Sequence, residues 1–417
     1  MPEPQPSRVP AGRAARSVRV AALAAKLAAG SEPAALRAAS LVALLGELRG
    51  AALKLGQLVS LQAGELFAPE LRAAFDALRE GAAPVPFSQV ESTLRRELGG
   101  DWRALLASLD PEPLAAASLG QVHAARARDG RELALKVQYP GVARGIDGDV
   151  DLAVWLLRSS GLLAPGREIA ATLARLKREL HRETDYRREA RSALAYRAWL
   201  ESDPDFEVPR VHLDLSTRRV LASDRLRALP IDDLRSPEHP QALRDRLGQA
   251  LLGLALRELF ELRRVQTDSN FANYLYLPGA RRIGLIDFGS VLELPHELAA
   301  AYRALLRAAV DGDERDLGAA AAKLGLLRGD EALATRRAWL ELARASAEPL
   351  RARGAWDFAG SDLPRRVRAL AAAAYRAPDL PVPTAEVLLV QRKLAGTYLL
   401  LRHIGARARA PRTWLDT

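Results

Sequence analysis

At 417 residues the chain is too long for one ordinary domain, so two or three compact units are expected. A hydrophobic fraction of 49% is enough for full cores, and a charged fraction of 27% argues against a largely disordered chain. The sequence contains no cysteine, which excludes disulfides, thiolate metal sites and cysteine nucleophiles and indicates a reducing compartment.

The net charge of +10 accompanies an excess of Ala and Arg, and we favour coding bias over a dedicated polyanion site as its cause. If the charge is functional, it fits an anionic membrane surface as well as nucleic acid. Aromatic residues are only 5% and do not interleave with basic runs, so no nucleic-acid partner is predicted. No stretch approaches the ~18–20 consecutive apolar residues that a bilayer span needs. We therefore expect a cytoplasmic protein, at most peripheral at the inner face of a membrane.

Two segments precede the expected catalytic body. Residues 1–12 contain four prolines and predict a disordered leader, and residues 13–86 predict a helical extension with apolar residues three and four apart. The basic start of this extension fits a transit-like or membrane-surface helix as well as a plain solvated helix. Lys54 and Gln57, in Lys-Leu-Gly-Gln, share one helix face, and in isolation they indicate a surface fragment.

Residues 87–228 predict a small unit of mixed structure. The sequence Asp129-Gly130 between two extended runs is a strong hairpin signal. Helices are expected at 87–98, 142–159 and 168–200, and strands at 121–128, 131–138, 208–213 and 219–222.

Residues 229–417 predict a larger, mostly helical unit, interrupted by short apolar runs at 274–277 and 283–286. The fold class is therefore α+β and predominantly helical. A helical prefix, a small β unit and a larger helical unit match a two-lobed, protein-kinase-like fold with an N-terminal helical extension. A nucleotide would bind in the cleft between the lobes.

Three residues of the larger unit carry the most specific signal. Asn273 follows Asp268 by five residues, and Asp287-Phe288-Gly289 comes shortly after, flanked by apolar runs. A kinase catalytic loop places its Asp against the phosphoryl acceptor and its Asn, five residues on, against a metal, which the Asp of an Asp-Phe-Gly turn also binds. The order and spacing predict Asp268 as the catalytic residue and Asn273 and Asp287 as magnesium ligands.

Lys136 ends a Leu-Ala-Leu-Lys sequence on the second strand of the expected hairpin, as a kinase phosphate-binding lysine does. A lysine in an apolar strand needs a partner, because burial of an unpaired ammonium is costly. Alone, Lys136 fits a strand-end lysine that reaches water equally well. Glu183 and Glu189 would point about 120° apart on one helix and could serve two lysines. An ordinary charged helix face is the simpler interpretation of these two residues.

An alanine-rich segment lies where a kinase has its glycine-rich phosphate loop. Alanines restrict the close backbone approach to phosphates that glycines allow. In isolation the segment indicates a turn before a strand, and its position before the hairpin suggests nucleotide binding. The candidate residues are Ala115, Ala116, Ala117, Ser118 and Gln121.

With these motifs in family order, the chain resembles the UbiB family of atypical kinases, the ADCK group. The matches are Lys-x-Gly-Gln at 54–57, the alanine-rich segment at 115–123, the lysine strand at 133–138, Glu-x-Asp at 183–185, Gln-Thr-Asp at 266–268, Asn273 and Asp287-Phe288-Gly289. The Gln-Thr-Asp loop resembles the ubiquinone-biosynthesis branch of the family.

The resemblance implies ATP and Mg²⁺ as cofactors. It assigns Lys136 to the nucleotide phosphates with Glu189 as its ion-pair partner, and it implies that Lys54 pairs with Glu183. Together with Gln57 and Asp185, Lys54 and Glu183 are the implied regulatory residues. Ordinary protein phosphorylation is disfavoured. The implied activity is that of an ATP-dependent atypical kinase or ATPase that supports ubiquinone biosynthesis.

Implied partners are ATP and ADP, a quinone precursor or other small acceptor, an anionic membrane surface and quinone-biosynthesis enzymes. Arg227-Ala228 replaces the usual Glu-Gly after the hinge, and Ser269 stands where many members have proline. The main alternative is a nucleotide-gated, non-catalytic scaffold for such enzymes. A conventional protein kinase conflicts with the missing glycine-rich loop, and a nucleic-acid binder lacks any recognition motif.

Overall fold

The computed structural model describes residues 84–117, 119–159, 177–178, 180–374, 380–381, 383–411 and 413–416. The predicted leader and most of the predicted helical extension therefore lie outside the described residues. The chain divides into two compact units, Met1–Arg188 with His212–Asp224 and Glu189–Val211 with Arg225–Thr417. The observed mixture of helices and small sheets confirms the predicted α+β, predominantly helical class.

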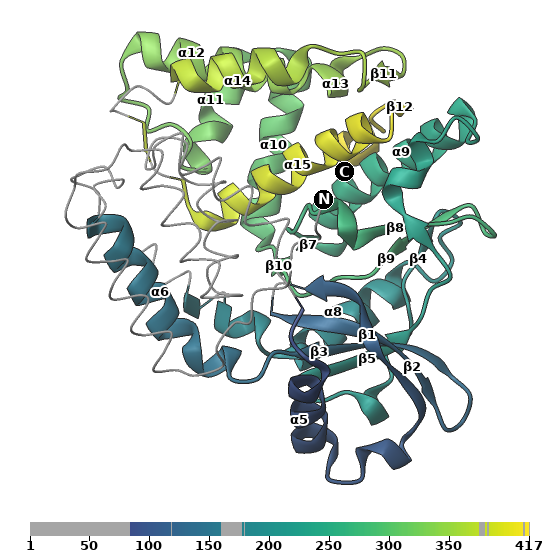
Figure 1. The fold of residues 1–417 in the computed structure, drawn as a ribbon. Coiled ribbons are helices and arrows are strands. Elements are labelled where there is room, and N and C mark those ends of the chain that lie inside the picture. The colour runs from purple at the N-terminus through teal and green to yellow at the C-terminus, as the bar shows by residue number, and fades with distance from the viewer. Residues whose placement is uncertain are drawn as a thin grey trace, which may run out of the picture. The chain divides into compact units, whose positions relative to one another are not determined.

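The first unit is built on a four-stranded sheet in the order β1-β2-β3-β5 (Figure 1). Its strands are β1 (Leu106–Ala117), β2 (Gly120–Ala127), β3 (Glu132–Gln138) and β5 (Val220–Asp224). Its helices are α5 (Phe87–Leu98), η1 (Trp102–Ala104), α6 (Val142–Ser159) and η2 (Leu213–Leu215).

Alternation along β3 places the core on one face of this sheet. Leu133, Leu135 and Val137 are buried with Val90 and Leu94 of α5, so α5 covers that face. Lys136 lies between two of these core residues in sequence and therefore points to the opposite face. The predicted hairpin and the helices at 87–98 and 142–159 are confirmed.

The sequence analysis missed one element of this region, and two of its predictions there are wrong. Strand β1 was not expected, although it pairs with β2 along most of its length. Only Val211 forms a bridge in the expected strand at 208–213. The helix expected at 168–200 is interrupted at 184–185, and part of that range lies outside the described residues.

The second unit begins within α8 (Tyr186–Trp199), after Arg188. It holds a four-stranded sheet in the order β4-β9-β8-β6 and the pairs β7–β10 and β11–β12. The strands are β4 (Phe206–Glu207), β6 (Leu229–Pro230), β7 (Arg264–Gln266), β8 (Tyr274–Leu277), β9 (Arg282–Leu285), β10 (Val291–Glu293), β11 (Trp356–Asp357) and β12 (Arg407–Ala408). The predicted apolar runs at 274–277 and 283–286 are thus confirmed as strands.

Helices make up most of the second unit. The long ones are α9 (Gln241–Arg257), α10 (His296–Asp311), α11 (Glu314–Lys323), α12 (Leu333–Ser346), α14 (Leu363–Ala374) and α15 (Ala385–His403). The short ones are η3 (Ile231–Arg235), the π-helical turn η4 (Glu258–Leu262), η5 (Phe271–Asn273), α13 (Glu348–Arg351) and α16 (Thr413–Asp416).

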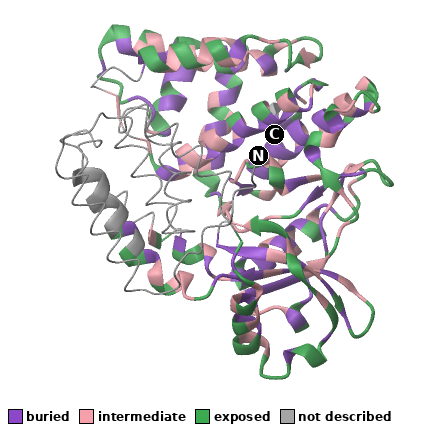
Figure 2. Cartoon of the chain, in the orientation of Figure 1, coloured by how far each residue is buried: buried purple, intermediate pink, exposed green. Residues whose placement is uncertain are grey.

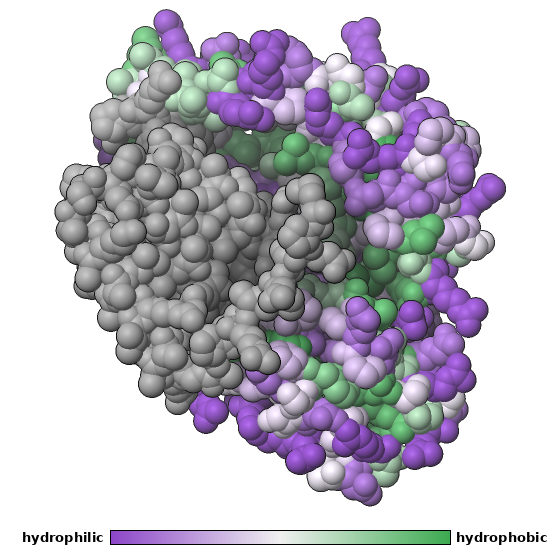
Figure 3. Space-filling view, viewed as in Figure 1, coloured by the Kyte–Doolittle hydropathy of each residue, from purple (hydrophilic) through white to green (hydrophobic). Residues whose placement is uncertain are grey.

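A large apolar core joins several of these helices. Residues of α10, α11, α12 and α15 are buried together around Tyr302 and Trp339, and Val265 of β7 belongs to the same core. Buried positions line the inner sides of these elements in Figure 2, and polar side chains occupy much of the visible outer face in Figure 3. Within the described residues, no helix is both long enough and apolar enough to span a bilayer.

Candidate active site

The loop that carries Asp268 follows β7 and is fixed from both ends. The backbone N–H and the hydroxyl of Thr267 donate to the carbonyl of Ser290 at 2.9 and 2.8 Å, which continues the β7–β10 ladder beyond Gln266. At the other end, the side chain of Asn270 accepts from the N–H of Ala272 and caps η5. Asp268 is thus held between a strand and a capped turn.

Asn273 ends η5 and points back to Asp268. Its Nδ2 donates to the Asp268 carbonyl at 3.3 Å and to Asp268 Oδ2 at 3.2 Å. The five-residue spacing therefore produces the convergence that the sequence predicts. Because the amide nitrogen is engaged with Asp268, Oδ1 is the atom with which Asn273 could bind a metal.

Strands β8 and β9 bring Asp287 to the same place. Tyr274 pairs with Leu285 in the antiparallel ladder, and the N–H of Ile286 donates to the carbonyl of Asn273 at 3.2 Å. Residues that directly precede β8 and directly follow β9 must lie at one end of the hairpin. The side chain of Gln266 also donates to the Asp287 carbonyl at 3.3 Å.

The Asp287-Phe288-Gly289 turn is tight. The N–H of Gly289 donates to Asp287 Oδ1 at 2.9 Å. A methyl group on Gly289 would lie 3.3 Å from Asp287 Oδ1 and 3.4 Å from Glu189 Oε2, so the carboxylate of Glu189, on α8, lies beside this turn. Glu189 itself is buried. The turn therefore places the carboxylates of Asp287 and Glu189 close to each other.

The donor set fits magnesium. Carboxylate and amide oxygens are hard ligands, and Mg²⁺ in phosphoryl-transfer sites is held by one or two carboxylates together with phosphates and water. Among the described residues no cluster of three or more His, Cys, Asp or Glu could hold a metal without such help. Gln266 Oε1 is buried, and no described group donates a hydrogen bond to it. The wall of the cavity that Asn273 and Asp287 line thus keeps a polar acceptor for water or ligand.

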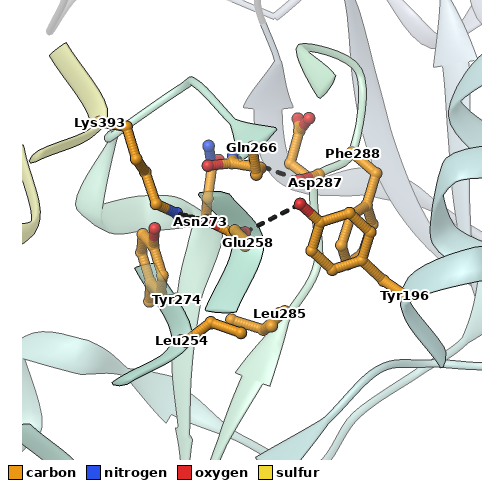
Figure 4. A pocket seen from close by; sticks show the side chains of 10 residues that line it. All are labelled: Tyr196, Leu254, Glu258, Gln266, Asn273, Tyr274, Leu285, Asp287, Phe288 and Lys393. Atoms are coloured by element: carbon orange, nitrogen blue, oxygen red, sulfur yellow. Dashed lines mark hydrogen bonds and ion pairs between the residues drawn. The ribbon is translucent and has the colours of Figure 1, made fainter. Parts of the chain in front are cut away.

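A buried polar cluster lines the same cavity as Asn273 and Asp287, as Figure 4 shows. The hydroxyl of Tyr196 lies 2.9 Å from Glu258 Oε1 and 2.8 Å from the Arg264 carbonyl, and these two acceptors share its one proton. Lys393 Nζ lies 2.6 Å from Glu258 Oε2, and the side chains of Lys393 and Glu258 are only 3% and 1% exposed. Glu258 opens the π-helical turn η4, a rare element often found at functional sites.

Burial governs the electrostatics of this cluster. It raises the pKa of Glu258, and the neighbouring Lys393 opposes that rise. Burial alone would lower the pKa of Lys393, but the charge of Glu258 and the hydroxyl of Tyr274 keep it above the ordinary value. The two groups therefore stabilise each other as an ion pair in a nearly dry environment.

Phe288 connects the Asp287-Phe288-Gly289 turn to the same cluster. Its ring is 3% exposed and lies 4.8 Å, centroid to centroid, from the ring of Tyr196. The small cavity lined by these residues has a volume of about 10 Å³, roughly the room that one water molecule needs. The cavity is therefore far too small for a nucleotide.

Lys136 lies in the first unit, on the sheet face opposite the core. Its Nζ lies 5.2 Å from the centroid of the Tyr186 ring. Glu189 belongs to the second unit, and its pairing with Lys136 stays a prediction.

The alanine-rich segment is the end of β1 rather than a free loop. Ala115, Ala116 and Ala117 pair with β2 up to the turn that leads into Gly120. A side chain at Gly120 would overlap the carbonyl of Val137, so this position requires glycine. Ser118 lies outside the described residues.

The side chain of Gln121 is occupied within the first unit. It is fully buried, and its Oε1 accepts from the N–H of Val85 at 2.8 Å. Its Nε2 lies 2.9 Å from His123 Nε2. These partners give Gln121 a structural role, and its predicted contact with nucleotide stays untested.

The Glu-x-Asp motif at 183–185 directly precedes α8. Asp185 Oδ1 accepts from the N–H of Arg187 at 3.1 Å, which is a helix-capping bond. Glu183 precedes this cap and Glu189 follows it, so the two do not share one helix and the expected 120° relation is wrong. Lys54 and Gln57 lie outside the described residues, and the pairing of Lys54 with Glu183 stays a prediction.

Sequence reasoning missed the residues of α15 that contact the site. Arg392 Nη2 donates to Asp268 Oδ1 at 2.7 Å, and the next residue is Lys393 of the buried ion pair. The available signal was a pair of adjacent cations in an otherwise apolar helical stretch, which requires buried partners.

Known proteins resemble this chain over most of its length. The model of the ABC1 atypical kinase-like domain matches residues 77–321. The rat atypical kinase COQ8B, a mitochondrial protein, is 38% identical over 377 residues, which are 90% of this chain and 71% of the relative. The mitochondrial atypical kinase COQ8 of Saccharomyces cerevisiae is 33% identical over 362 residues, 86% of this chain and 72% of the relative.

Other relatives are longer than the matched region. This chain covers 49% of the mitochondrial atypical kinase coq-8 of Caenorhabditis elegans, to which it is 35% identical. Among solved structures, the complex of Rv3197 with erythromycin from Mycobacterium tuberculosis superposes with a TM-score of 0.64 at 27% identity, over 88% of this chain and 92% of that chain. The domain match and this likeness confirm the predicted kinase-like fold.

Proposed function

This chain belongs to the UbiB family of ABC1 atypical kinases, ATP-dependent kinase-like enzymes, and from that premise we propose that it binds Mg-ATP and turns it over in support of ubiquinone biosynthesis. The observation that carries the proposal is the convergence of Asp268, Asn273 and Asp287 at one end of the β8–β9 hairpin. Two hard-oxygen ligands and a carboxylate beside them are the protein's share of a phosphoryl-transfer site.

Each of the three residues has a distinct proposed role. Asn273 Oδ1 and the Asp287 carboxylate would hold magnesium, which when bound neutralises charge on the phosphate oxygens. Asp268 would orient the attacking acceptor or water, because its carboxylate is anchored and lies next to the amide of Asn273. Hydrogen bonds to Asp287 and Asp268 fix both carboxylates before any ligand binds.

The first unit would supply Lys136 to the phosphates and Glu189 of α8 would be its ion-pair partner, as the family resemblance implies. The β1–β2 turn follows paired alanines instead of a glycine-rich loop, which reduces the backbone freedom available to phosphates. We also propose a regulatory contact between Lys54 and Glu183, with Gln57 and Asp185 beside it. The restricted turn and this contact together disfavour phosphorylation of proteins in trans.

The acceptor is proposed from the family rather than from geometry. Relatives are named mitochondrial atypical kinases, and the Gln-Thr-Asp loop at 266–268 is the feature that links this chain to the ubiquinone branch. We therefore propose a quinone precursor or water as acceptor. The net charge of +10 suits peripheral contact with an anionic membrane and with the enzymes assembled there.

The test compares nucleotide binding with turnover. ATP affinity is measured calorimetrically with Mg²⁺ and with EDTA, and phosphate release is followed with and without anionic liposomes. Asp287→Asn should weaken Mg-ATP binding by at least about 10-fold. Asp268→Asn should keep the affinity within about 3-fold but lower turnover by about 100-fold or more. Asp311→Asn, an exposed aspartate at the end of α10, is the matched control.

Two results would contradict the proposal. Turnover of the Asp268 variant at the wild-type rate would remove Asp268 from the reaction, and equal affinity in EDTA would remove the metal. Tight Mg-ATP binding by the wild type without any turnover, together with co-purification of partner enzymes, would favour the scaffold alternative.

A further inference from the structure

Helix α15 packs directly on the loop that carries Asp268. The hydroxyl of Ser269 donates to the carbonyl of Arg392 at 3.3 Å. One turn later, a Cβ on Gly396 would overlap Cβ and Oγ of Ser269, so the helix backbone approaches the loop more closely than any side chain would allow. Arg392 and Gly396 are four residues apart and share one helix face, which is the face that covers Ser269.

The side chain of Arg392 reaches past Ser269 to the catalytic aspartate. Its Nη2 donates to Asp268 Oδ1 at 2.7 Å, and the two side chains are 13% and 14% exposed. A charge-assisted bond of this length in a largely desolvated place is among the stronger polar contacts of a protein. It is therefore more than a surface ion pair, which would contribute little.

The two carboxylate oxygens of Asp268 have different partners. Oδ1 accepts from Arg392 and Oδ2 accepts from Asn273. The terminal torsion of an aspartate is broad and easily rotated, so a donor on one oxygen alone would leave the plane of the carboxylate poorly defined. Donors on opposite oxygens, one from η5 and one from α15, define that plane.

We propose that Arg392 is the positioning residue for Asp268, which makes α15 part of the active centre. The inference rests on the proposed function, in which Asp268 orients the acceptor. Arg392 lies beyond residues 77–321, the part of the chain that matches the kinase-like domain model. The active centre therefore extends past that domain into α15.

Positioning and plain structural support have different consequences. If Arg392 only stabilised the fold, any substitution that keeps the fold would also keep turnover. A positioning residue acts on the reacting geometry, where an error of about 1 Å can cost about 100-fold in rate, while nucleotide affinity stays the same. Because the contact is one hydrogen bond rather than a two-pronged one, a lysine could replace part of it.

The test uses three variants of the full chain. Arg392→Met keeps the aliphatic stem and removes the charge, and Arg392→Lys restores a cation. Arg402→Met is the matched control, because Arg402 is on the same helix but donates to the backbone of Phe358 and Ser361. Measured quantities are kcat and KM for Mg-ATP, ATP affinity and the unfolding midpoint.

For Arg392→Met we expect kcat to fall by about 10- to 100-fold with KM and affinity within about 2-fold. Arg392→Lys should recover at least about one third of the lost kcat on a logarithmic scale, and Arg402→Met should match the wild type. Unchanged kcat in Arg392→Met would overturn the proposal. So would a loss of kcat that follows the unfolding midpoint equally in the Met and Lys variants.

A stability cycle separates this inference from the proposed function. Wild-type protein without turnover would refute the proposed function, but the pair would still be tested by the unfolding midpoints of Arg392→Met, Asp268→Asn and the double variant. If the shift in unfolding midpoint of the double variant differs by at least about 2 °C from the sum of the two single shifts, Arg392 holds Asp268 in solution. Additive shifts would refute the contact itself.

Discussion

Removal of the cation from the buried Glu258–Lys393 pair should strongly destabilise the second unit. In Lys393→Met a side chain of similar length replaces the ammonium, so packing is largely kept and the charge is lost. The carboxylate of Glu258, 1% exposed, then keeps the hydroxyl of Tyr196 as a side-chain donor but no cation beside it. An uncompensated buried carboxylate is the dominant consequence of the change.

The expected cost follows from the burial of both partners. Loss of one member of a buried ion pair typically costs about 3–5 kcal/mol. For a unit of this size about 1 kcal/mol lowers the unfolding midpoint by about 2–4 °C, so a fall of roughly 6–20 °C is expected. The double variant Lys393→Met with Glu258→Gln should recover most of this loss, because a neutral amide still accepts from Tyr196 and carries no charge to desolvate.

The pH dependence gives an independent check. Burial raises the folded-state pKa of Glu258 above the ordinary value near 4.5, so the folded state binds the proton more tightly than the unfolded state. Stability from this group is therefore fully present below about pH 4.5 and is lost as pH rises through the folded-state pKa. Without Lys393 that pKa rises further, so the variant should lose stability relative to wild type as the pH rises through the folded-state pKa of the wild type.

Calorimetric unfolding between pH 5 and pH 8 measures both effects. The reasoning is refuted if Lys393→Met unfolds within about 2 °C of wild type at pH 7.5, because an unpaired buried carboxylate must then have found water. It is also refuted if the double variant is no more stable than the single one, since charge would not be the cause.

Two further predictions concern backbone and cap positions. Gly396→Ala should lower kcat by about 10-fold and stability by about 1–3 kcal/mol, because the added methyl group displaces Ser269. The control is Gly253→Ala in α9, where a methyl group meets nothing within 4 Å, and this variant should instead be more stable by about 0.5–1 kcal/mol. Equal effects of the two substitutions would contradict the steric argument. Asp185→Ala should cost about 1 kcal/mol in thermal unfolding through loss of the α8 cap, whereas an Asp185→Asn variant as unstable as the alanine one would rule out capping.

Local sequence signals were reliable where one residue pattern determined one element. The hairpin of β2 and β3 follows from Asp129-Gly130, and β8 and β9 follow from short runs of large apolar residues. Strand β1 was missed because Pro111 and Pro113 interrupt it. Proline is tolerated there since β1 is an edge strand with a largely exposed, irregular ladder.

The end of the predicted helix at 168–200 illustrates a different failure. Helical periodicity continues through 184–185, but Asp185 caps a new helix instead of continuing the old one. An Asp before Tyr-Arg-Arg-Glu carried that signal, because Asp favours the position that precedes a helix. Periodicity alone outweighed it. The angle expected between Glu183 and Glu189 was wrong for this reason.

The candidate site was predictable only in part for a related reason. Asp268 and Asn273 converge through a five-residue turn, so their spacing predicts their contact. Arg392 meets Asp268 across 124 residues of sequence, and only the packing of α15 determines that meeting. No motif marks it, and a helical pattern says which residues share a face but not what that face covers.

Adjacent cations of α15 serve two different partners because they point about 100° apart on the helix. Arg392 contacts Asp268 at a place 13–14% exposed, whereas Lys393 contacts Glu258 at a place 1–3% exposed. The more deeply buried pair, Lys393 and Glu258, makes any other register of α15 unfavourable in free energy, because a shift by one residue would leave two buried charges unpaired. That register in turn places Arg392 at the carboxylate of Asp268, so the buried pair determines the position of the more exposed pair.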